Sequence, residues 1–142
     1  MPLQFPPSRG TLVICDYSTG FRPPEMVKRR LAVVISHRLP QRDGLCAVVP
    51  LSTTPARAGI RYQCRIDLPQ SPPPPFEGTV KWVKADMLAT VCFNRLDLPR
   101  TGRDRDTGRR RYLQIRLPDD EMLKVQEAVL HGLCMGHLTA HL

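Results

Sequence analysis

The sequence predicts a mainly β fold, a small barrel that carries one amphipathic helix near its C-terminus. Short runs of β-branched and aliphatic residues recur along the chain between prolines, glycines and charged residues, and several such strands at short spacing are typical of a barrel. After residue 117 the apolar residues instead follow helical spacing. A chain of 142 residues is large enough for one hydrophobic core, so we expect a single domain over residues 1–142.

The first three strands are predicted at residues 10–17, 31–36 and 45–52, because each range holds a continuous apolar run. Residues 18–29 contain a glycine and two consecutive prolines, which predict a loop. Residues 37–44 are rich in turn-forming residues and should connect the second strand to the third.

Two further strands are predicted on either side of a proline-rich segment. Residues 61–68 alternate polar and apolar side chains, which indicates a half-exposed strand, and residues 79–84 should form the next one. Between them, residues 69–76 include four consecutive prolines, which have no backbone N–H to donate. We interpret this segment as a stiff, extended connector rather than a ligand for an SH3 domain.

The last part of the chain is predicted to form a basic loop, a strand and a helix. Residues 100–111 hold six arginines and no apolar anchor, so we expect a mobile loop that is either a solvated charge run or a phosphate-binding loop. Residues 112–117 should form a final strand. A helix is expected from Pro118 to about His131, within a C-terminal segment of about 118–135. The apolar stripe of this helix, expected to pack on the barrel, consists of Met122, Val125, Val129 and Leu133.

The chain is strongly basic, with a net charge of +8 that comes mostly from arginine. Because arginine binds phosphates with two parallel hydrogen bonds, this composition favours a partner that carries phosphates, although it fits DNA, RNA or an acidic protein equally well. No apolar run approaches the roughly 20 residues needed to cross a bilayer, and the first nine residues lack the apolar stretch of a secretory signal. We therefore expect a cytoplasmic protein without membrane contact.

Five scattered cysteines, with no C-x-x-C pair among them, favour free thiols over a disulfide framework or a structural zinc site. One local pattern, Cys134-x-x-His137-x-x-x-His141, has the spacing of metal ligands. No fourth ligand lies near it in the sequence, so we interpret it as a solvated tail. We expect no metal site and no cofactor.

Arg30 stands directly before one apolar strand, and Ser52, Thr53 and Thr54 end or follow the next strand. Residues at the start of one strand and at the end of its neighbour can converge at one end of a sheet. A fixed guanidinium beside hydroxyl donors is suited to holding a phosphodiester and stabilising additional charge on it. Nucleic acid is therefore the leading candidate partner.

Several of these features, in this order and at this spacing, resemble the MazF/PemK (Kid) toxins of bacterial type II toxin–antitoxin systems. The resemblance covers roughly residues 9–135. Its markers are Arg9-Gly10, Glu25 five residues before Arg30, Ala32-Val-Val-Ile-Ser36, Val49-Pro50-Leu51-Ser52-Thr53-Thr54, Trp82-x-x-x-Asp86-x-x-x-Thr90-Val91, Arg95-Leu96 and the closing helix.

The resemblance implies an SH3-like barrel that forms a homodimer and is neutralised by a cognate antitoxin protein, with DNA binding only together with that antitoxin. It also implies a metal-independent endoribonuclease that cuts single-stranded RNA by attack of the ribose 2′-hydroxyl on the adjacent phosphorus. Such a reaction needs a base for the 2′ proton, an acid for the leaving oxygen and a cation for the charged phosphorus centre. It needs no metal ion, because the nucleophile is already in place within the substrate.

The family's catalytic arginine corresponds to Arg30, which would bind the scissile phosphate. Ser52 falls where the family usually has a catalytic threonine, with Thr53 beside it. Glu25 matches a loop glutamate that could act as base, and Asp86 matches the aspartate that the Kid branch uses as base. The residues expected to bind RNA around them are Lys28, Arg29, Thr54 and Lys84.

Each of these residues also has a plain structural interpretation. Arg30 could be a surface arginine at a strand edge, and Glu25 could be a solvated loop carboxylate. The hydroxyls of Ser52 and Thr53 could cap the backbone of a turn. Asp86 could bond backbone groups at a strand end.

Three departures from the family pattern concern the site. Lys84 stands where the Kid branch has an arginine that acts as acid. Leu31 replaces the proline that generally follows the catalytic arginine, and Pro24 stands where the family often has serine or a catalytic histidine. Because proline cannot transfer protons, a mechanism here must depend on Arg30, the carboxylates and the hydroxyls.

Two other functions fit the same barrel class. One is a CcdB-like toxin that inhibits DNA gyrase through its C-terminal helix and needs no arginine–hydroxyl site. The other is a noncatalytic nucleic-acid-binding module that uses the arginines of residues 100–111. Replacing Arg30 separates them from a nuclease, because only cutting should depend on it.

Overall fold

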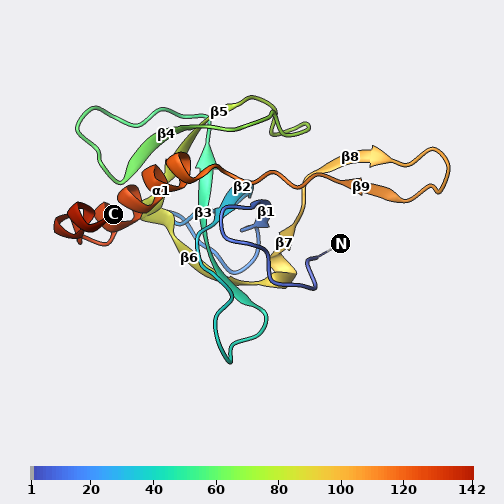
Figure 1. The fold of residues 1–142 in the computed structure, drawn as a ribbon, viewed down its shortest axis with the longest axis horizontal. Helices are drawn as coiled ribbons and strands as arrows, with labels where there is room; N and C mark the ends of the chain where they lie inside the picture. Colours follow the sequence, from blue (N-terminus) through green and yellow to red (C-terminus); the bar gives the residue numbers. More distant parts are fainter. Residues whose placement is uncertain (1) are drawn as a thin grey trace.

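A computed structural model describes residues 2–142 of the chain (Figure 1). The strands are β1 (Leu12–Asp16), β2 (Arg29–Val34), β3 (Leu45–Ser52), β4 (Gln63–Asp67), β5 (Val80–Lys84), β6 (Ala89–Cys92), β7 (Leu96–Asp97), β8 (Arg100–Arg103) and β9 (Arg110–Tyr112). The helices are α1 (Asp119–Gly132) and three 3₁₀ turns, η1 (Ala85–Met87), η2 (Phe93–Arg95) and η3 (Gly136–His141). The predicted mainly β fold with a C-terminal helix is confirmed, and the five strands predicted before residue 85 are all present.

The main sheet is antiparallel and strongly bent. Its strands follow the order β4-β5-β3-β2-β1-β7, and β6 pairs with β3 outside this path. Strand β3 pairs with β6 over residues 45–48 and with β5 at Leu51 and Ser52. Pro50 lies between the stretch of β3 that pairs with β6 and the stretch that pairs with β5. A missing N–H is tolerated at such a position. Among residues 2–142 no pairing joins β4 to β7, so the predicted barrel is an open sheet that curls without closing.

Both faces of strands β1, β2 and β3 are buried, which explains why their sequences are almost continuously apolar. On one face, Leu31 and Val33 belong to a core that α1 and β4 cover. On the other face, Ala32 and Val34 belong to a second core that includes residues of β6 and β7. Because side chains alternate along a strand, Arg30 leaves β2 on the face of the second core and Leu31 on the face of the first.

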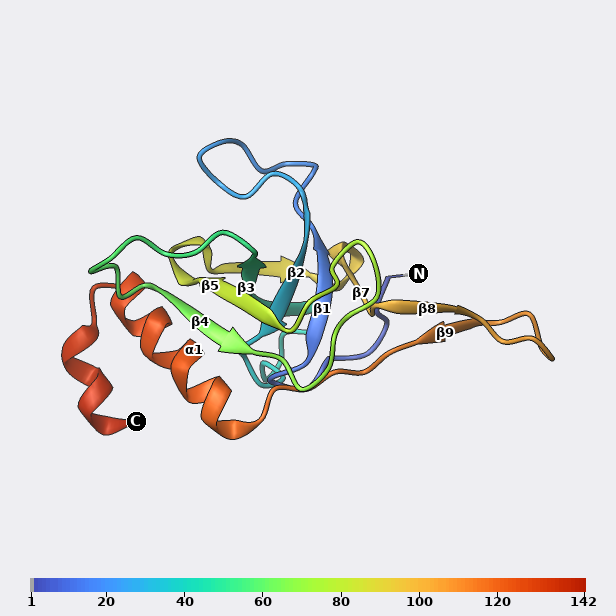
Figure 2. The same cartoon turned by 90° about the horizontal axis from the view of Figure 1, so that it is seen from above.

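Helix α1 lies beside β4 (Figure 2), and one apolar stripe of the helix packs into the first core. Met122, Val125 and Ala128 are buried. Met122 and Val125 were both predicted to belong to this stripe. Leu133 is 52% exposed, so its assignment to the stripe is wrong; it follows the last residue of α1, where the helical spacing ends. The helix begins after Pro118 and carries three acidic residues in its first turn, which complement the positive end of the helix dipole.

The arginine-rich segment is a β-hairpin rather than the predicted irregular loop. Strands β8 and β9 pair antiparallel, and all of their residues are exposed. Figures 1 and 2 show the hairpin projecting from the end of the molecule opposite η3. The sequences of β8 and β9 show no alternation of polar and apolar residues, because neither strand packs against a core.

The final strand predicted at residues 112–117 is also wrong as a regular strand. Only Tyr112 belongs to β9, and the following residues run extended beside the start of β1. Leu12 donates its N–H to the carbonyl of Ile115, and Leu117 donates to the carbonyl of Gly10. This extended segment therefore closes the first core without forming a ladder. Over the described residues, no helix is long and apolar enough to cross a membrane.

Candidate functional site

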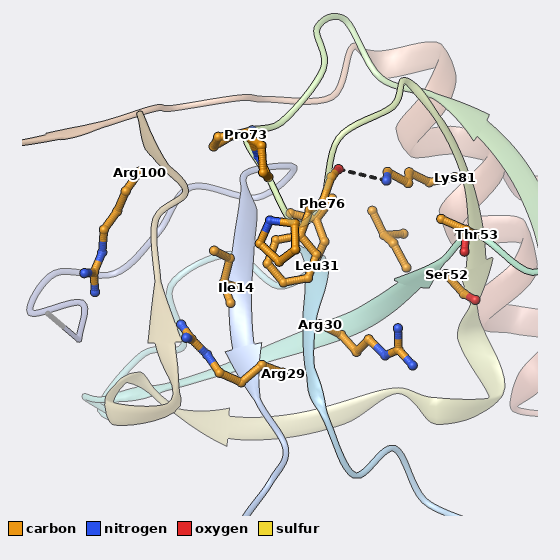
Figure 3. Close-up of a pocket in the computed structure, with 13 residues that line it drawn as sticks. Ile14, Arg29, Arg30, Leu31, Ser52, Thr53, Pro73, Phe76, Lys81 and Arg100 are labelled. Carbon is orange, nitrogen blue, oxygen red and sulfur yellow. Dashed lines mark hydrogen bonds between the residues drawn. The ribbon is translucent and has the colours of Figure 1, made fainter. Parts of the chain in front are cut away.

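The start of β2 and the end of β3 lie side by side at one end of the sheet. The register pairs Ala32 with Pro50 and Val33 with Val49. Continued by two residues, the same register sets Arg30 across from Ser52, and Figure 3 shows the guanidinium of Arg30 extending toward Ser52. The structure thus brings together the cation and the hydroxyls that the sequence placed on two neighbouring strands.

These residues line a cavity of about 560 Å³, a size typical of ligand sites. Arg30, Ser52 and Thr53 stand on one side of it (Figure 3). The other lining residues are Ile14, Arg29, Leu31, Leu51, Pro73, Pro74, Pro75, Phe76, Lys81 and Arg100. This lining contains arginine and lysine side chains and no carboxylate, so its charge favours an anion.

Arg30 has donor capacity that the protein leaves unused. Its Nε is buried, and among residues 2–142 it has no hydrogen-bond partner. The residue also lines the cavity, where its guanidinium charge attracts an anionic ligand. A phosphate entering the cavity would meet a guanidinium that can bind it with paired hydrogen bonds.

The hydroxyl of Ser52 is positioned by the turn that follows β3. Its Oγ accepts a hydrogen bond from the backbone N–H of Thr54 at 3.0 Å, which leaves the hydroxyl proton available for a second acceptor. This is the backbone-capping role that the sequence allowed, and it does not prevent donation toward the cavity. Thr53 and Thr54 are exposed beside it, and only Thr53 lines the cavity.

The two predicted carboxylates lie elsewhere, at a second cavity of about 380 Å³. Glu25 belongs to the loop between β1 and β2, where its carboxylate accepts the N–H of Arg22 at 2.6 Å. Asp86 lies in η1 and accepts a hydrogen bond from Gln63 Nε2 at 3.2 Å. Both carboxylates are exposed. The structure therefore brings Glu25 and Asp86 together with each other, but not into the cavity lined by Arg30.

Arg95 holds the loop that carries Glu25. Its Nη1 donates to the carbonyls of Asp16 at 3.0 Å and Thr19 at 2.7 Å, and its guanidinium lies 4.8 Å from the centre of the Phe21 ring. Gly20 has a φ of +84° in this loop, and a Cβ there would lie 3.0 Å from Arg95 Nη2. The glycine is required by both its conformation and this close approach.

The predicted RNA-binding residues separate into two groups. Arg29 and Lys28 are exposed, and Arg29 lines the first cavity while Lys28 does not. Lys84 is 9% exposed, and its ammonium donates to the carbonyl of Thr54 at 2.9 Å and to Gln63 Oε1 at 3.0 Å. Desolvation lowers the pKa of Lys84 from its ordinary value. Its contacts make it a support of the turn after Ser52 rather than a free cation.

Sequence reasoning missed Lys81 and the proline wall as parts of the site. Lys81 is 3% exposed, and its ammonium donates to the carbonyls of Phe76 at 2.9 Å and Glu77 at 3.1 Å. Residues 73–76 fold over the cavity as its apolar wall. The run of prolines ending in phenylalanine was the available signal, but nothing in it indicates which face the segment covers.

Across residues 2–142 no group of three His, Cys, Asp or Glu side chains could hold a metal ion. The five cysteines are free, and Cys134 is exposed just before η3.

Residues 8–133 match the family model described as "PemK-like, MazF-like toxin of type II toxin-antitoxin system". Among curated proteins, the chain is 32% identical to an uncharacterized protein of Haemophilus influenzae, with 92% of each chain covered. It is 28% identical to the uncharacterized protein YifN of Escherichia coli, with 94% of this chain and 95% of YifN covered.

Solved structures show the same fold at low identity. MazF from Deinococcus radiodurans superposes with a TM-score of 0.60 at 21% identity, covering 93% of this chain and all of that one. The Mycobacterium tuberculosis toxin MazF-mt6 gives 0.54 at 15% identity, covering 87% and 96%. A mycobacterial endoribonuclease in complex with its cognate antitoxin gives 0.53 at 18% identity, covering 91% and 94%.

Proposed function

We propose that this chain, which belongs to the PemK-like, MazF-like toxins of type II toxin–antitoxin systems, is an endoribonuclease that cuts single-stranded RNA. The observation that carries the proposal is the single cavity that Arg30 lines together with Ser52 and Thr53. That donor set fits a phosphodiester at the point where negative charge must develop.

In the proposed reaction the ribose 2′-oxygen attacks the adjacent phosphorus while the bond from phosphorus to the 5′-oxygen breaks. The leaving 5′-oxygen takes a proton from Arg30 or from water, and the products are a 2′,3′-cyclic phosphate and a 5′-hydroxyl. Arg30 holds the scissile phosphate and stabilises the charge on its oxygens, and Ser52 and Thr53 donate hydrogen bonds to the same oxygens. The nucleophile belongs to the substrate, so the reaction proceeds without a metal ion.

The carboxylates fit the role of base if the ribose lies on Arg30's side of the sheet. Tyr17, Phe21 and Met26 line the second cavity. Tyr17 belongs to the core on the face from which Arg30 projects, and Phe21 and Met26 pack against that core. Glu25 and Asp86 therefore stand on the side where a ribose next to the Arg30-bound phosphate could extend. We assign the 2′ proton to Glu25 or Asp86, and a matched pair of single substitutions distinguishes them. Glu25→Gln or Asp86→Asn, whichever removes the base, should lower the rate without weakening RNA binding.

The family also supports two proposals about partners. We infer that a cognate antitoxin binds this chain and blocks its RNA site, with any DNA binding depending on that antitoxin. We infer as well that the active form is a homodimer. A mycobacterial relative of the same fold was solved with its cognate antitoxin, which supports the first inference.

The proposed function is tested by the chemistry of the ends produced from a long single-stranded RNA. New 5′ ends should accept a labelled phosphate directly from a polynucleotide kinase, because they carry hydroxyls. A single 2′-deoxy substitution on the 5′ side of a mapped cut should abolish that cut and leave others intact. Ser52→Ala should slow cutting by about 100-fold, as expected for losing one donor to the charged centre, and Ser52→Thr should restore most of it.

Intact RNA with protein shown to be folded would contradict the nuclease and favour a gyrase-directed or purely binding role. Cuts that leave 5′-phosphates would also contradict the proposed mechanism, because another nucleophile would then be attacking.

A further inference from the structure

We propose that residues 73–76 form a platform on which one base of the RNA stacks, beside the phosphate held by Arg30. This inference rests on the proposed function, since it names the nucleotide subsite of the same cavity. It assigns to the proline segment between β4 and β5 a direct part in choosing where the RNA is cut.

The centre of the cavity is apolar, although its edges are cationic. Its apolar surface comes from Ile14, Phe76 and the prolines at 73–75, while Leu31 and Leu51 behind them are only 2% and 3% exposed. Phe76 is partly buried and packs against the first core. A nucleobase is a flat group with two apolar faces, and aromatic side chains bind it by stacking. A phosphate alone would leave this apolar surface uncovered.

Two arginines flank this apolar centre. Arg29 and Arg30 are neighbours on β2, so their side chains leave the strand on opposite faces. Figure 3 shows them diverging below Leu31 and Phe76, with Arg30 directed toward Ser52. A nucleotide within a strand carries one phosphate on its 5′ side and one on its 3′ side. A base on the platform could therefore place its two phosphates at two separate guanidiniums.

The cation at the far end of the cavity is already engaged. Arg100 Nη2 lies 2.6 Å from Asp97 Oδ2 in an ion pair. Lys81 is also engaged, by the carbonyls of Phe76 and Glu77. Arg29 and Arg30 are thus the lining cations best placed for phosphates, one on each side of the apolar centre.

The platform is held in place before any ligand binds. Lys81 bonds the carbonyls at its C-terminal end, and the N–H of Phe76 donates to the carbonyl of Pro73 at 3.1 Å. The N–H of Gly78 donates to Ser71 Oγ at 2.8 Å, which ties the two ends of the segment together. Proline also restricts the backbone, so stacking would cost little ordering entropy.

The test compares RNA oligonucleotides that bear a mapped cut site made uncleavable by a 2′-deoxy nucleotide. In a set of such oligonucleotides, each base near the cut is removed in turn to leave an abasic site. For wild type, one abasic position should weaken binding by about 5- to 150-fold, the range measured for a single stacked base. Phe76→Ala should bind the intact oligonucleotide more weakly than wild type by the same factor. Removing the sensitive base should then weaken binding to Phe76→Ala no further.

Two variants control for folding. Phe93 is also partly buried, but it packs against the second core and does not line this cavity, so Phe93→Ala should keep the abasic sensitivity of wild type. Phe76→Tyr keeps an aromatic face and should restore it. Phe76→Ala should still cut RNA, because Arg30 and Ser52 are intact, but at a broader set of sites.

Failure of this inference differs from failure of the proposed function. If wild type and Phe76→Ala cut the same sites and show the same abasic sensitivity, the platform is overturned and the nuclease stands. If RNA recognition is unchanged but antitoxin binding weakens in Phe76→Ala, the apolar wall binds a protein side chain and the base platform is likewise overturned. If wild type cuts no RNA, the proposed function itself has failed.

Discussion

The ammonium of Lys84 on β5 donates a hydrogen bond to the backbone carbonyl of Thr54 at 2.9 Å, and it thereby fixes the turn that presents Ser52 and Thr53. The same ammonium also bonds Gln63 Oε1 at 3.0 Å. A buried cation with two bonded acceptors connects the end of β3 to β4 and β5, so the position of the candidate hydroxyls depends on a residue outside the cavity.

Replacing Lys84 with methionine should leave both acceptors without their donor. We expect a loss of about 1–3 kcal/mol in the free energy of unfolding, measured by urea denaturation. Cutting should slow more than RNA binding weakens, because the hydroxyls lose their fixed position. Lys28→Met is the matched control, since Lys28 is exposed and does not line the cavity. Equal stability of Lys84→Met and wild type would show that the two hydrogen bonds of the Lys84 ammonium do not stabilise the fold.

A second stabilising contact joins α1 to β4. Glu121 is 7% exposed, and its carboxylate accepts the N–H of Asp67 at 3.0 Å and the ammonium of Lys124 at 2.9 Å. Glu121→Ala should lower the free energy of unfolding by about 1 kcal/mol, because the N–H of Asp67 and the ammonium of Lys124 lose their shared acceptor. Glu127→Ala, an exposed position on the same helix, should have little effect on the urea midpoint. A similar loss in both variants would contradict this explanation.

Alkaline pH should destabilise the fold through its buried thiols. Burial raises the pKa of Cys15 and of Cys46 from 9.0 to about 11. Between these values the unfolded thiols ionise while the folded ones stay protonated, so stability that is complete below pH 9 is lost as the pH rises toward 11. The lysines at 81 and 84, whose pKa values desolvation lowers, act in the opposite direction below pH 10.5.

The comparison of wild type with Cys46→Ala isolates the thiol contribution. Urea unfolding in a reducing buffer should show a smaller loss of stability between about pH 8 and about pH 10.5 in the variant. The same pH dependence in both proteins would show that Cys46 ionises equally in the folded and unfolded states.

The hairpin β8–β9 should contribute to RNA affinity without any preference for particular RNA sequences. Its arginines are exposed and face no core, so we expect contacts with phosphates. Replacing Arg103, Arg105 and Arg109 with glutamine should weaken binding of unrelated RNAs equally. It should also reduce the salt slope of the binding constant by up to about 2, at about 0.7 for each phosphate contact. Arg116→Gln, at an exposed position outside the hairpin, should change the slope less. An unchanged slope in the triple variant would mean that the hairpin is only a solvated arm.

Strands buried on both faces could be predicted closely from sequence. Residues 45–52 were predicted with the bounds that β3 has, because a long apolar run between turn residues has few other interpretations. The antiparallel pairing of β2 with β3 then brought Arg30 and Ser52 together as expected. Helix α1 was equally clear from its spacing and its acidic first turn.

Features that depend on the tertiary arrangement could not be predicted. The β8–β9 hairpin lacks an apolar face, so its pattern resembles that of a loop. The burial of Lys81 and Lys84 depends on backbone carbonyls that only the folded chain places nearby. The placement of Glu25 and Asp86 at a different cavity from the one lined by Arg30 likewise depends on how the β1–β2 loop lies against η1, for which local sequence carries no signal.

Cleavage of a long single-stranded RNA in excess EDTA by wild type, Arg30→Ala and the control Arg116→Ala tests most directly whether Arg30 carries a metal-independent site. We predict discrete products from wild type and from the control, and none from Arg30→Ala although circular dichroism shows it folded. Cutting by Arg30→Ala at the wild-type rate, or loss of wild-type cutting in EDTA, would contradict a metal-independent site built on Arg30.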